Sequence, residues 1–166
     1  MKLQYLIILI FGIFISCNQR PEAKTTDLKP EVSLEHKQSV ASQIAELKDA
    51  GYQIFEYIDE ESGDTIIMQE YYMAFLKRGP IRSQSKTEAD SLQKLHLAHL
   101  GRMYKEGFAD ISGPFGDDQD TRGITVYNVP SLKMADSLAN LDPMVKAGRL
   151  VIEIRPWWAG KGFPLR

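Results

Sequence analysis

Residues 65–76 read TIIMQEYYMAFL, and this stretch decides the fold class. Apolar and aromatic side chains alternate along it, with Tyr71, Met73 and Phe75 on one face. This two-residue period is typical of a β-strand, because successive side chains of a strand point to opposite faces of the sheet. We therefore expect a strand here, and the neighbouring segments indicate what it pairs with.

The segment before this strand is expected to form a hairpin with it. Residues 52–58 are aromatic and β-branched, and residues 60–64, EESGD, are typical of a turn. Residues 33–50 carry apolar side chains at helical spacing and are followed by Gly51, which indicates an amphipathic helix with a glycine stop. A helix and a hairpin, residues 33–64, would thus extend the domain on its N-terminal side.

Helices and strands alternate after residue 76. Helices are expected where apolar residues recur at helical spacing, and strands where β-branched runs end at Pro or Gly. In chain order these elements are a helix over 87–106, strands over 109–115 and 123–129, a helix over 131–141 and a strand over 150–155. The order β-α-β-β-α-β predicts an α+β domain over residues 65–158 with a ferredoxin-like arrangement, in which helices lie on one face of an antiparallel sheet. Residues 159–166 form a C-terminal tail.

The overall composition excludes several classes of protein. The 166 residues are 43% hydrophobic and 25% charged, which is ordinary for a globular chain and unlike a disordered or polytopic membrane protein. Twenty Lys and Arg against 22 Asp and Glu give a net charge of −2, so no basic field points to nucleic acid as a partner. A single cysteine excludes a disulfide framework within the chain and a cysteine-rich zinc site.

The N-terminus has the pattern of a secretion signal. Residues 3–16 are almost continuously apolar behind a lysine, but the run is shorter than the about 20 residues of a membrane-spanning helix. It ends at Ser16 and Cys17, which resembles the lipobox of bacterial lipoproteins. We therefore expect a signal peptide over 1–16, lipidation of Cys17, a solvated tether over 17–32, and a place in the bacterial cell envelope where only the lipid anchor contacts the membrane. An uncleaved short anchor and ordinary secretion are the alternatives.

Two histidines and one aspartate are candidates for proton-transfer chemistry. On a helical wheel for residues 87–106, His96 and His99 fall inside the apolar arc, His99 near its middle. Asp142 follows the helix over 131–141 and projects into the inward arc of that helix. Because both helices pack on one face of the sheet, an imidazole and this carboxylate could meet and form a general base or acid. Core histidines with satisfied hydrogen bonds, and an aspartate that only stops a helix, are the alternative interpretation.

The same residues leave a metal site as a weaker alternative. His96 and His99 lie three residues apart and share a helix face, but the spacing places no third ligand. Asp117, Asp118 and Asp120 match only part of a calcium loop, and we interpret them as a solvated turn. We therefore assign no metal and no cofactor.

Several short motifs keep a common order and spacing along the second half of the chain. They are His99-Leu100, Gly107, Ser112-Gly113-Pro114-Phe115, the strand over 123–129, Asp142-Pro143 with Gly148, and Ile154-Arg155-Pro156-Trp157. Together they resemble the YCII-related (YciI-like) domain family over about residues 66–158. The resemblance implies a homodimer with a dimeric α+β barrel, in which two ferredoxin-like protomers pack their sheets face to face. It also implies an active site of one histidine and one aspartate, matching His99 and Asp142, beside a loop that matches Gly113-Pro114.

Two functions follow from these observations. The first is a cofactor-independent lyase, dehydrohalogenase-like enzyme or isomerase, in which His99 acts on a small organic molecule and Asp142 orients it. Backbone N–H groups near Gly113 would bind developing negative charge. The residues that we assign to substrate binding are Ser112, Gly113, Pro114 and His96. The second function is a non-catalytic envelope module that binds a small ligand or a protein partner.

Overall fold

The computed structural model describes residues 39–165. The predicted signal peptide, the lipidation site Cys17 and the tether lie outside these residues, as does the start of the helix predicted over 33–50. Within the described part, no helix has the length and apolar character needed to cross a membrane.

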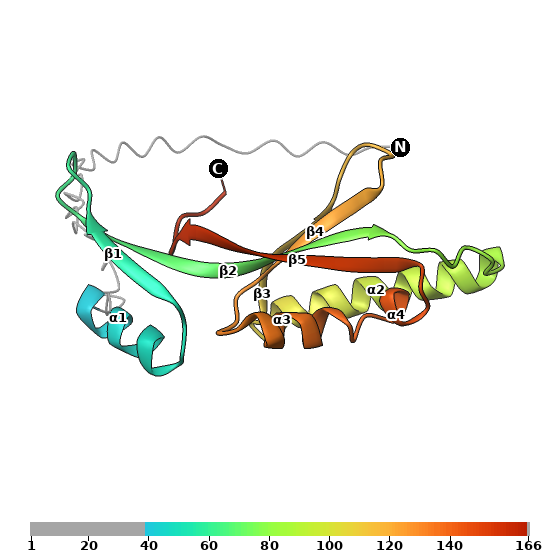
Figure 1. The fold of residues 1–166 in the computed structure, drawn as a ribbon, viewed down its shortest axis with the longest axis horizontal. Coiled ribbons are helices and arrows are strands. Elements are labelled where there is room, and N and C mark those ends of the chain that lie inside the picture. Colours follow the sequence, from blue (N-terminus) through green and yellow to red (C-terminus); the bar gives the residue numbers. More distant parts are fainter. Residues whose placement is uncertain (1–38, 166) are drawn as a thin grey trace, which may run out of the picture. The chain divides into compact units, whose positions relative to one another are not determined.

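The main sheet has the strand order of a ferredoxin-like domain. Its strands, in spatial order, are β5 (Leu150–Gly160), β2 (Thr65–Arg78), β4 (Thr121–Tyr127) and β3 (Ala109–Pro114). All three neighbouring pairs are antiparallel, and the order along the chain from β2 is β-α-β-β-α-β, with two consecutive helices in the second helical position (Figure 1). The predicted α+β class and ferredoxin-like arrangement are confirmed.

The long strand β2 is the centre of this sheet. One of its edges pairs with β5 from Met68 to Arg78. Its other edge pairs first with β1 (Ile54–Ile58) and then with β4, so two strands share this edge one after the other. The hairpin of β1 and β2 is the predicted extension, and α1 (Val40–Asp49) lies before it and contacts β1. β5 runs to Gly160, two residues beyond the predicted end of the domain.

The remaining helices lie on one face of the sheet, as Figure 1 shows; they are α2 (Lys86–Lys105), α3 (Leu132–Ala139) and α4 (Pro143–Lys146). A capping box starts α2, because the side chain of Ser85 accepts from the N–H of Glu88 at 3.3 Å and the carboxylate of Glu88 accepts from the N–H of Ser85 at 2.7 Å. This box begins two residues before Thr87, where the sequence predicted the helix start. The one-turn helix α4 was not predicted.

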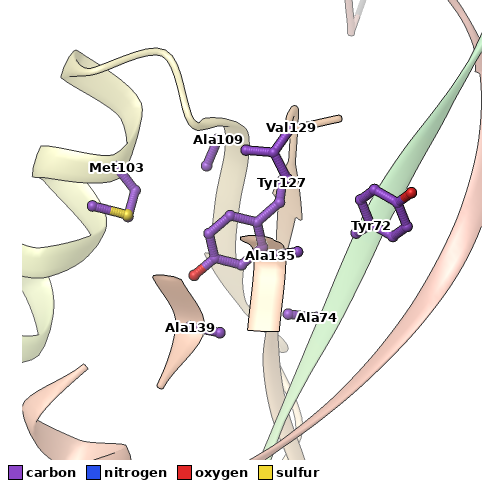
Figure 2. Close-up of a cluster of buried hydrophobic side chains, with 8 residues drawn as sticks. All are labelled: Tyr72, Ala74, Met103, Ala109, Tyr127, Val129, Ala135 and Ala139. Carbon is purple, nitrogen blue, oxygen red and sulfur yellow. The ribbon is translucent and has the colours of Figure 1, made fainter. Parts of the chain in front are cut away.

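The main hydrophobic core lies between this helix layer and the sheet. Figure 2 shows its buried side chains, which are Tyr72, Ala74, Met103, Ala109, Tyr127, Val129, Ala135 and Ala139. A smaller cluster of Leu76, Met144 and Leu150 packs α4 against the start of β5 and the end of β2. Burial of these apolar groups holds α4 against the sheet.

Gly79, directly after β2, lies against the backbone of the turn before β5. Its N–H donates to the carbonyl of Arg149 at 2.8 Å, and a Cβ at this position would lie 2.1 Å from the carbonyl oxygen of Gly148. Backbone cannot move aside as a flexible side chain can. This close approach therefore requires glycine at position 79.

We expect Gly79→Ala to lower the free energy of unfolding by about 1–3 kcal/mol, the usual effect of overpacking. The matched control is Gly101→Ala on α2, where an added Cβ meets nothing within 4 Å. Alanine in an open helical position should stabilise the protein by roughly 0.5–1 kcal/mol. Denaturant unfolding of both variants measures the difference, and equal effects would contradict the close approach.

Candidate functional site

Asp142 is the N-cap of α4. Its Oδ1 accepts from the N–H of Met144 at 2.8 Å, and the residue is buried with 2% exposure. Asp142 follows the preceding helix as the sequence predicted, but the start of a second helix at this residue was not expected. Pro143 starts a new helical turn, so the carboxylate faces the end of a helix that favours negative charge.

The second oxygen of Asp142 binds an imidazole. Nδ1 of His96 lies 2.5 Å from Oδ2 of Asp142, and His96 is also buried. Burial by itself raises the pKa of Asp142, but the hydrogen bonds from His96 and from the N–H of Met144 outweigh it and lower the pKa below its ordinary value. An ionised carboxylate only accepts hydrogen bonds, so Nδ1 of His96 carries the hydrogen of this bond.

His99, one turn further along α2, has a different partner. Its Nδ1 accepts from Nη2 of Arg102 at 3.1 Å, and its Nε2 is buried without a hydrogen-bond partner in the described part of the chain. Burial lowers the pKa of His99, and the positive charge of Arg102 adds to this effect. The charge of Asp142 raises the pKa, but less than burial lowers it. His99 is therefore held as a neutral imidazole.

The structure thus brings Asp142 into contact with His96, whereas the family resemblance in the sequence paired Asp142 with His99. Both imidazoles are buried, as the helical wheel predicted, with exposures of 8% for His96 and 3% for His99. The wheel does not distinguish them, because residues three apart lie on the same helix face.

A pocket of about 420 Å³ opens beside His96. It lies between α2, the ends of β2, β3 and β4, and the segment from Met144 to Leu150. Four of the predicted site residues line it, namely His96, Ser112, Gly113 and Pro114. His99 and Asp142 are not among its lining residues. Asp142 therefore reaches the pocket only through the imidazole that it binds.

Ser112 and Gly113 belong to strand β3 and not to a free loop. They pair with Thr125 and Ile124 of β4, and the hydroxyl groups of Ser112 and Thr125 lie 3.0 Å apart. Ser112, Gly113 and Ile124 therefore form the part of the pocket wall that the sheet supplies.

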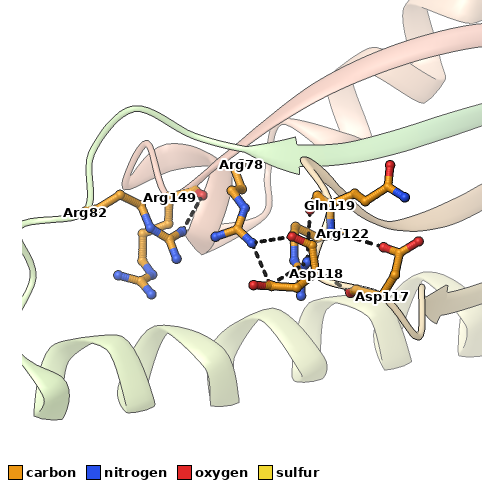
Figure 3. Close-up of polar contacts among 7 residues, drawn as sticks. All are labelled: Arg78, Arg82, Asp117, Asp118, Gln119, Arg122 and Arg149. Carbon is orange, nitrogen blue, oxygen red and sulfur yellow. Dashed lines mark hydrogen bonds and ion pairs between the residues drawn. The ribbon is translucent and has the colours of Figure 1, made fainter.

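Four arginines also line the pocket, and none of them was predicted from the sequence. They are Arg78, Arg82, Arg122 and Arg149, and Figure 3 shows them above helix α2. They come from the end of β2, the loop after it, the start of β4 and the turn before β5. No local spacing in the sequence connects these segments, so no pattern could have grouped them.

The metal alternatives gain no ligands from the fold. Within residues 39–165, no three His, Cys, Asp or Glu side chains are placed to hold one metal ion. Asp118, considered above as part of a calcium loop, instead accepts from Arg78 at 2.6 Å and forms an ion pair with Arg122 at 3.1 Å.

Comparison with known proteins identifies a family. The model of the YCII-related domain matches residues 71–158, more than half of the chain. A solved structure to which the chain is similar is 5-chloro-2-hydroxyhydroquinone dehydrochlorinase (TftG) from Burkholderia phenoliruptrix AC1100, in complex with 2,5-dihydroxybenzoquinone. That match has 21% sequence identity and a TM-score of 0.40, and it covers 52% of this chain and 92% of the other. No curated protein matches the chain significantly.

The neutral state of His99 predicts how stability depends on pH. Its pKa in the folded protein is below the ordinary value of 6.5, so the unfolded chain takes up this proton first as the pH falls. The stability that His99 contributes is therefore present above about pH 6.5 and lost on acidification. We expect His99→Gln to flatten the decrease in unfolding free energy between about pH 7.5 and about pH 5.5, a window above the titration of carboxylates.

Urea unfolding at several pH values measures this slope. Lys94→Gln, an exposed change on the same helix, is the control and should leave the slope unchanged. A slope in His99→Gln equal to that of the unchanged protein would contradict the assignment.

Proposed function

The chain belongs to the family of YCII-related domains, and from this premise we propose that it is a cofactor-independent enzyme of the lyase or isomerase type. The proposed reaction removes a proton from carbon in a small organic molecule. The single observation that carries the proposal is the contact of 2.5 Å between His96 and Asp142, with His96 in the wall of the pocket.

His96 is the proposed general base. Its Nδ1–H is occupied by Asp142, so Nε2 is the nitrogen that is left to accept a proton. No other hydrogen bond among residues 39–165 engages this ring. The carboxylate would hold the ring in one orientation and stabilise the imidazolium that forms when the proton arrives. We assign this role to His96 and not to His99, because His99 does not line the pocket.

The step is balanced without an added reagent. The C–H bond breaks, its proton moves to Nε2 of His96, and its electron pair stays on the substrate as a carbanion or enolate. In an isomerase the imidazolium returns the proton to another atom of the substrate. In a lyase the electron pair forms a double bond while a leaving group departs. Guanidinium groups in the pocket wall would stabilise the developing negative charge.

Hydrogen exchange at carbon tests the proposal without a known substrate. We expect the protein to catalyse exchange of C–H for deuterium, or halide release, with some members of a panel of small carbonyl compounds and halogenated organic acids in D₂O. His96→Ala should lower the rate by about 10²–10⁴-fold, which is the usual contribution of a general base. Proton NMR and a halide assay measure both reactions.

His99→Gln is the matched control, because it changes the other buried imidazole of α2, which lies outside the pocket wall. Its rate should stay within roughly tenfold of the unchanged protein, well short of the loss of a general base. Full activity in a folded His96→Ala variant would exclude the mechanism. Binding of panel compounds without any exchange or elimination would favour the non-catalytic module.

We also propose that the chain is a homodimer that uses the sheet face opposite α2, α3 and α4. Met73 and Phe75 point to this face, since their neighbours Tyr72 and Ala74 are in the core under the helices. Trp157 pairs with Tyr71, lies on the same face and is 42% exposed. A partly exposed aromatic face of this kind is suited to a partner sheet.

Light scattering after size exclusion tests the dimer. We expect a dimer for the unchanged protein and a monomer for Trp157→Glu, because a charge would be buried in the interface. Tyr104→Glu, which changes an exposed aromatic side chain on α2, is the control and should remain dimeric. A monomeric unchanged protein at all concentrations tested would exclude this interface.

A further inference from the structure

The pocket beside His96 has a strongly cationic wall. Four arginines line it, and none of its described lining residues is an aspartate or a glutamate. Such a concentration of guanidinium groups is costly unless anions balance it, because like charges repel in a partly desolvated space. The protein itself supplies a carboxylate partner to only two of the four arginines within the described residues.

Two of the four share one carboxylate at the rim. Nη2 of Arg78 donates to Oδ1 of Asp118 at 2.6 Å, and Nη1 of Arg122 lies 3.1 Å from the same oxygen (Figure 3). Asp118 is 88% exposed, so it sits at the solvent side of the cluster and does not enter the pocket wall. One carboxylate for two guanidinium groups leaves this pair partly uncompensated.

The other two arginines have no carboxylate partner. No ion pair within the described residues includes Arg82 or Arg149. Arg82 donates to the carbonyl of Arg149 at 3.2 Å, and Nη1 of Arg149 donates to the side-chain oxygen of Gln84 at 2.9 Å. Both acceptors are neutral. Nε of Arg149 is buried and has no partner among the residues described, although buried polar groups are nearly always hydrogen-bonded.

The rest of the wall is largely apolar. Leu97, Leu100, Ile124 and Met144 line the same pocket. A volume of about 420 Å³ is at the small end of the range for ligand pockets. The pocket therefore offers a cationic part, an apolar part and one imidazole.

We propose that this pocket binds a small organic carboxylate with an apolar body, and that Arg82 and Arg149 hold the carboxylate group. Arginine is suited to this role because its planar fork binds a carboxylate with two parallel hydrogen bonds. The inference deepens the proposed function and rests on it only for the chemistry at His96. In that chemistry the bound acid would present a C–H group of its body to Nε2.

A matched pair of probes tests the charge requirement. Benzoate and benzamide have the same ring and nearly the same shape, and only benzoate carries a charge. We expect benzoate, and not benzamide, to shift the backbone amide signals of the pocket residues in an NMR titration and to raise the melting temperature. Equal binding of the two probes, or binding of neither, would overturn the proposal. Binding of inorganic phosphate in preference to benzoate would overturn the carboxylate assignment as well.

Substitutions in the wall test the two arginines. Arg82→Met and Arg149→Met should each weaken benzoate binding by roughly tenfold or more, which corresponds to the loss of a charge-assisted hydrogen bond. Arg82 is exposed and is not expected to be needed for folding, so it keeps the test valid if Arg149→Met is unstable. Lys94→Met removes one positive charge from α2 outside the pocket wall and is the control. An affinity for benzoate in Arg82→Met equal to that in Lys94→Met would overturn the assignment.

Two assays on the unchanged protein, benzoate binding and C–H exchange, separate this inference from the proposed function. If the exchange assay fails while benzoate is still preferred over benzamide, only the catalytic proposal is lost. If exchange occurs but only with neutral compounds, only the carboxylate inference is lost.

Discussion

A buried carboxylate needs hydrogen-bond donors at both of its oxygens, and the candidate site depends on how Asp142 obtains them. The N–H of Met144 binds one oxygen and His96 binds the other. The first bond fixes the start of α4, and the second fixes the ring of His96 on α2. Along the chain, β3, β4 and α3 lie between these two helices. One buried charge therefore holds together two elements that are distant in sequence and form adjoining parts of the pocket wall.

Most of the fold could be predicted from the sequence because its elements are long enough to show a period. The 14-residue strand β2 and the 20-residue helix α2 each contain several repeats of their pattern. The start of α2 was predicted one residue late, because Ser85 and Glu88 form the capping box and Thr87 lies inside the helix. α4 was missed since four residues are too few to show any helical period.

The candidate site was predicted only in part, because Asp142 was paired with His99 and the structure places it against His96. Periodicity indicated that His96 and His99 are both buried, which is correct, but burial does not specify a neighbour. His96 meets Asp142 only because α4 begins there and packs through Met144 against Leu76 and Leu150, whereas His99 meets Arg102 of its own helix. The arginine cluster could not be predicted either, because it also depends on contacts between segments that are distant in the sequence. Arg82 and Arg149 come together only because the loop at Gly79 lies against the turn at Gly148.

The two imidazoles of α2 show how neighbours give one residue type opposite properties. His96 meets a group that only accepts hydrogen bonds, so it holds a hydrogen on Nδ1, and Nε2 is the nitrogen that the proposed step uses. His99 meets an arginine, which only donates, so its Nδ1 keeps the lone pair and its hydrogen is on Nε2. In the proposed step a proton moves from substrate to His96, which places positive charge next to Asp142 and leaves negative charge in the pocket. The guanidinium groups lie on the pocket side, so each charge that forms has an opposite charge already in place. In the proposed reaction this arrangement would favour removal of a proton from an anionic substrate. Such a substrate gains a second negative charge in this step, and the guanidinium groups would stabilise it.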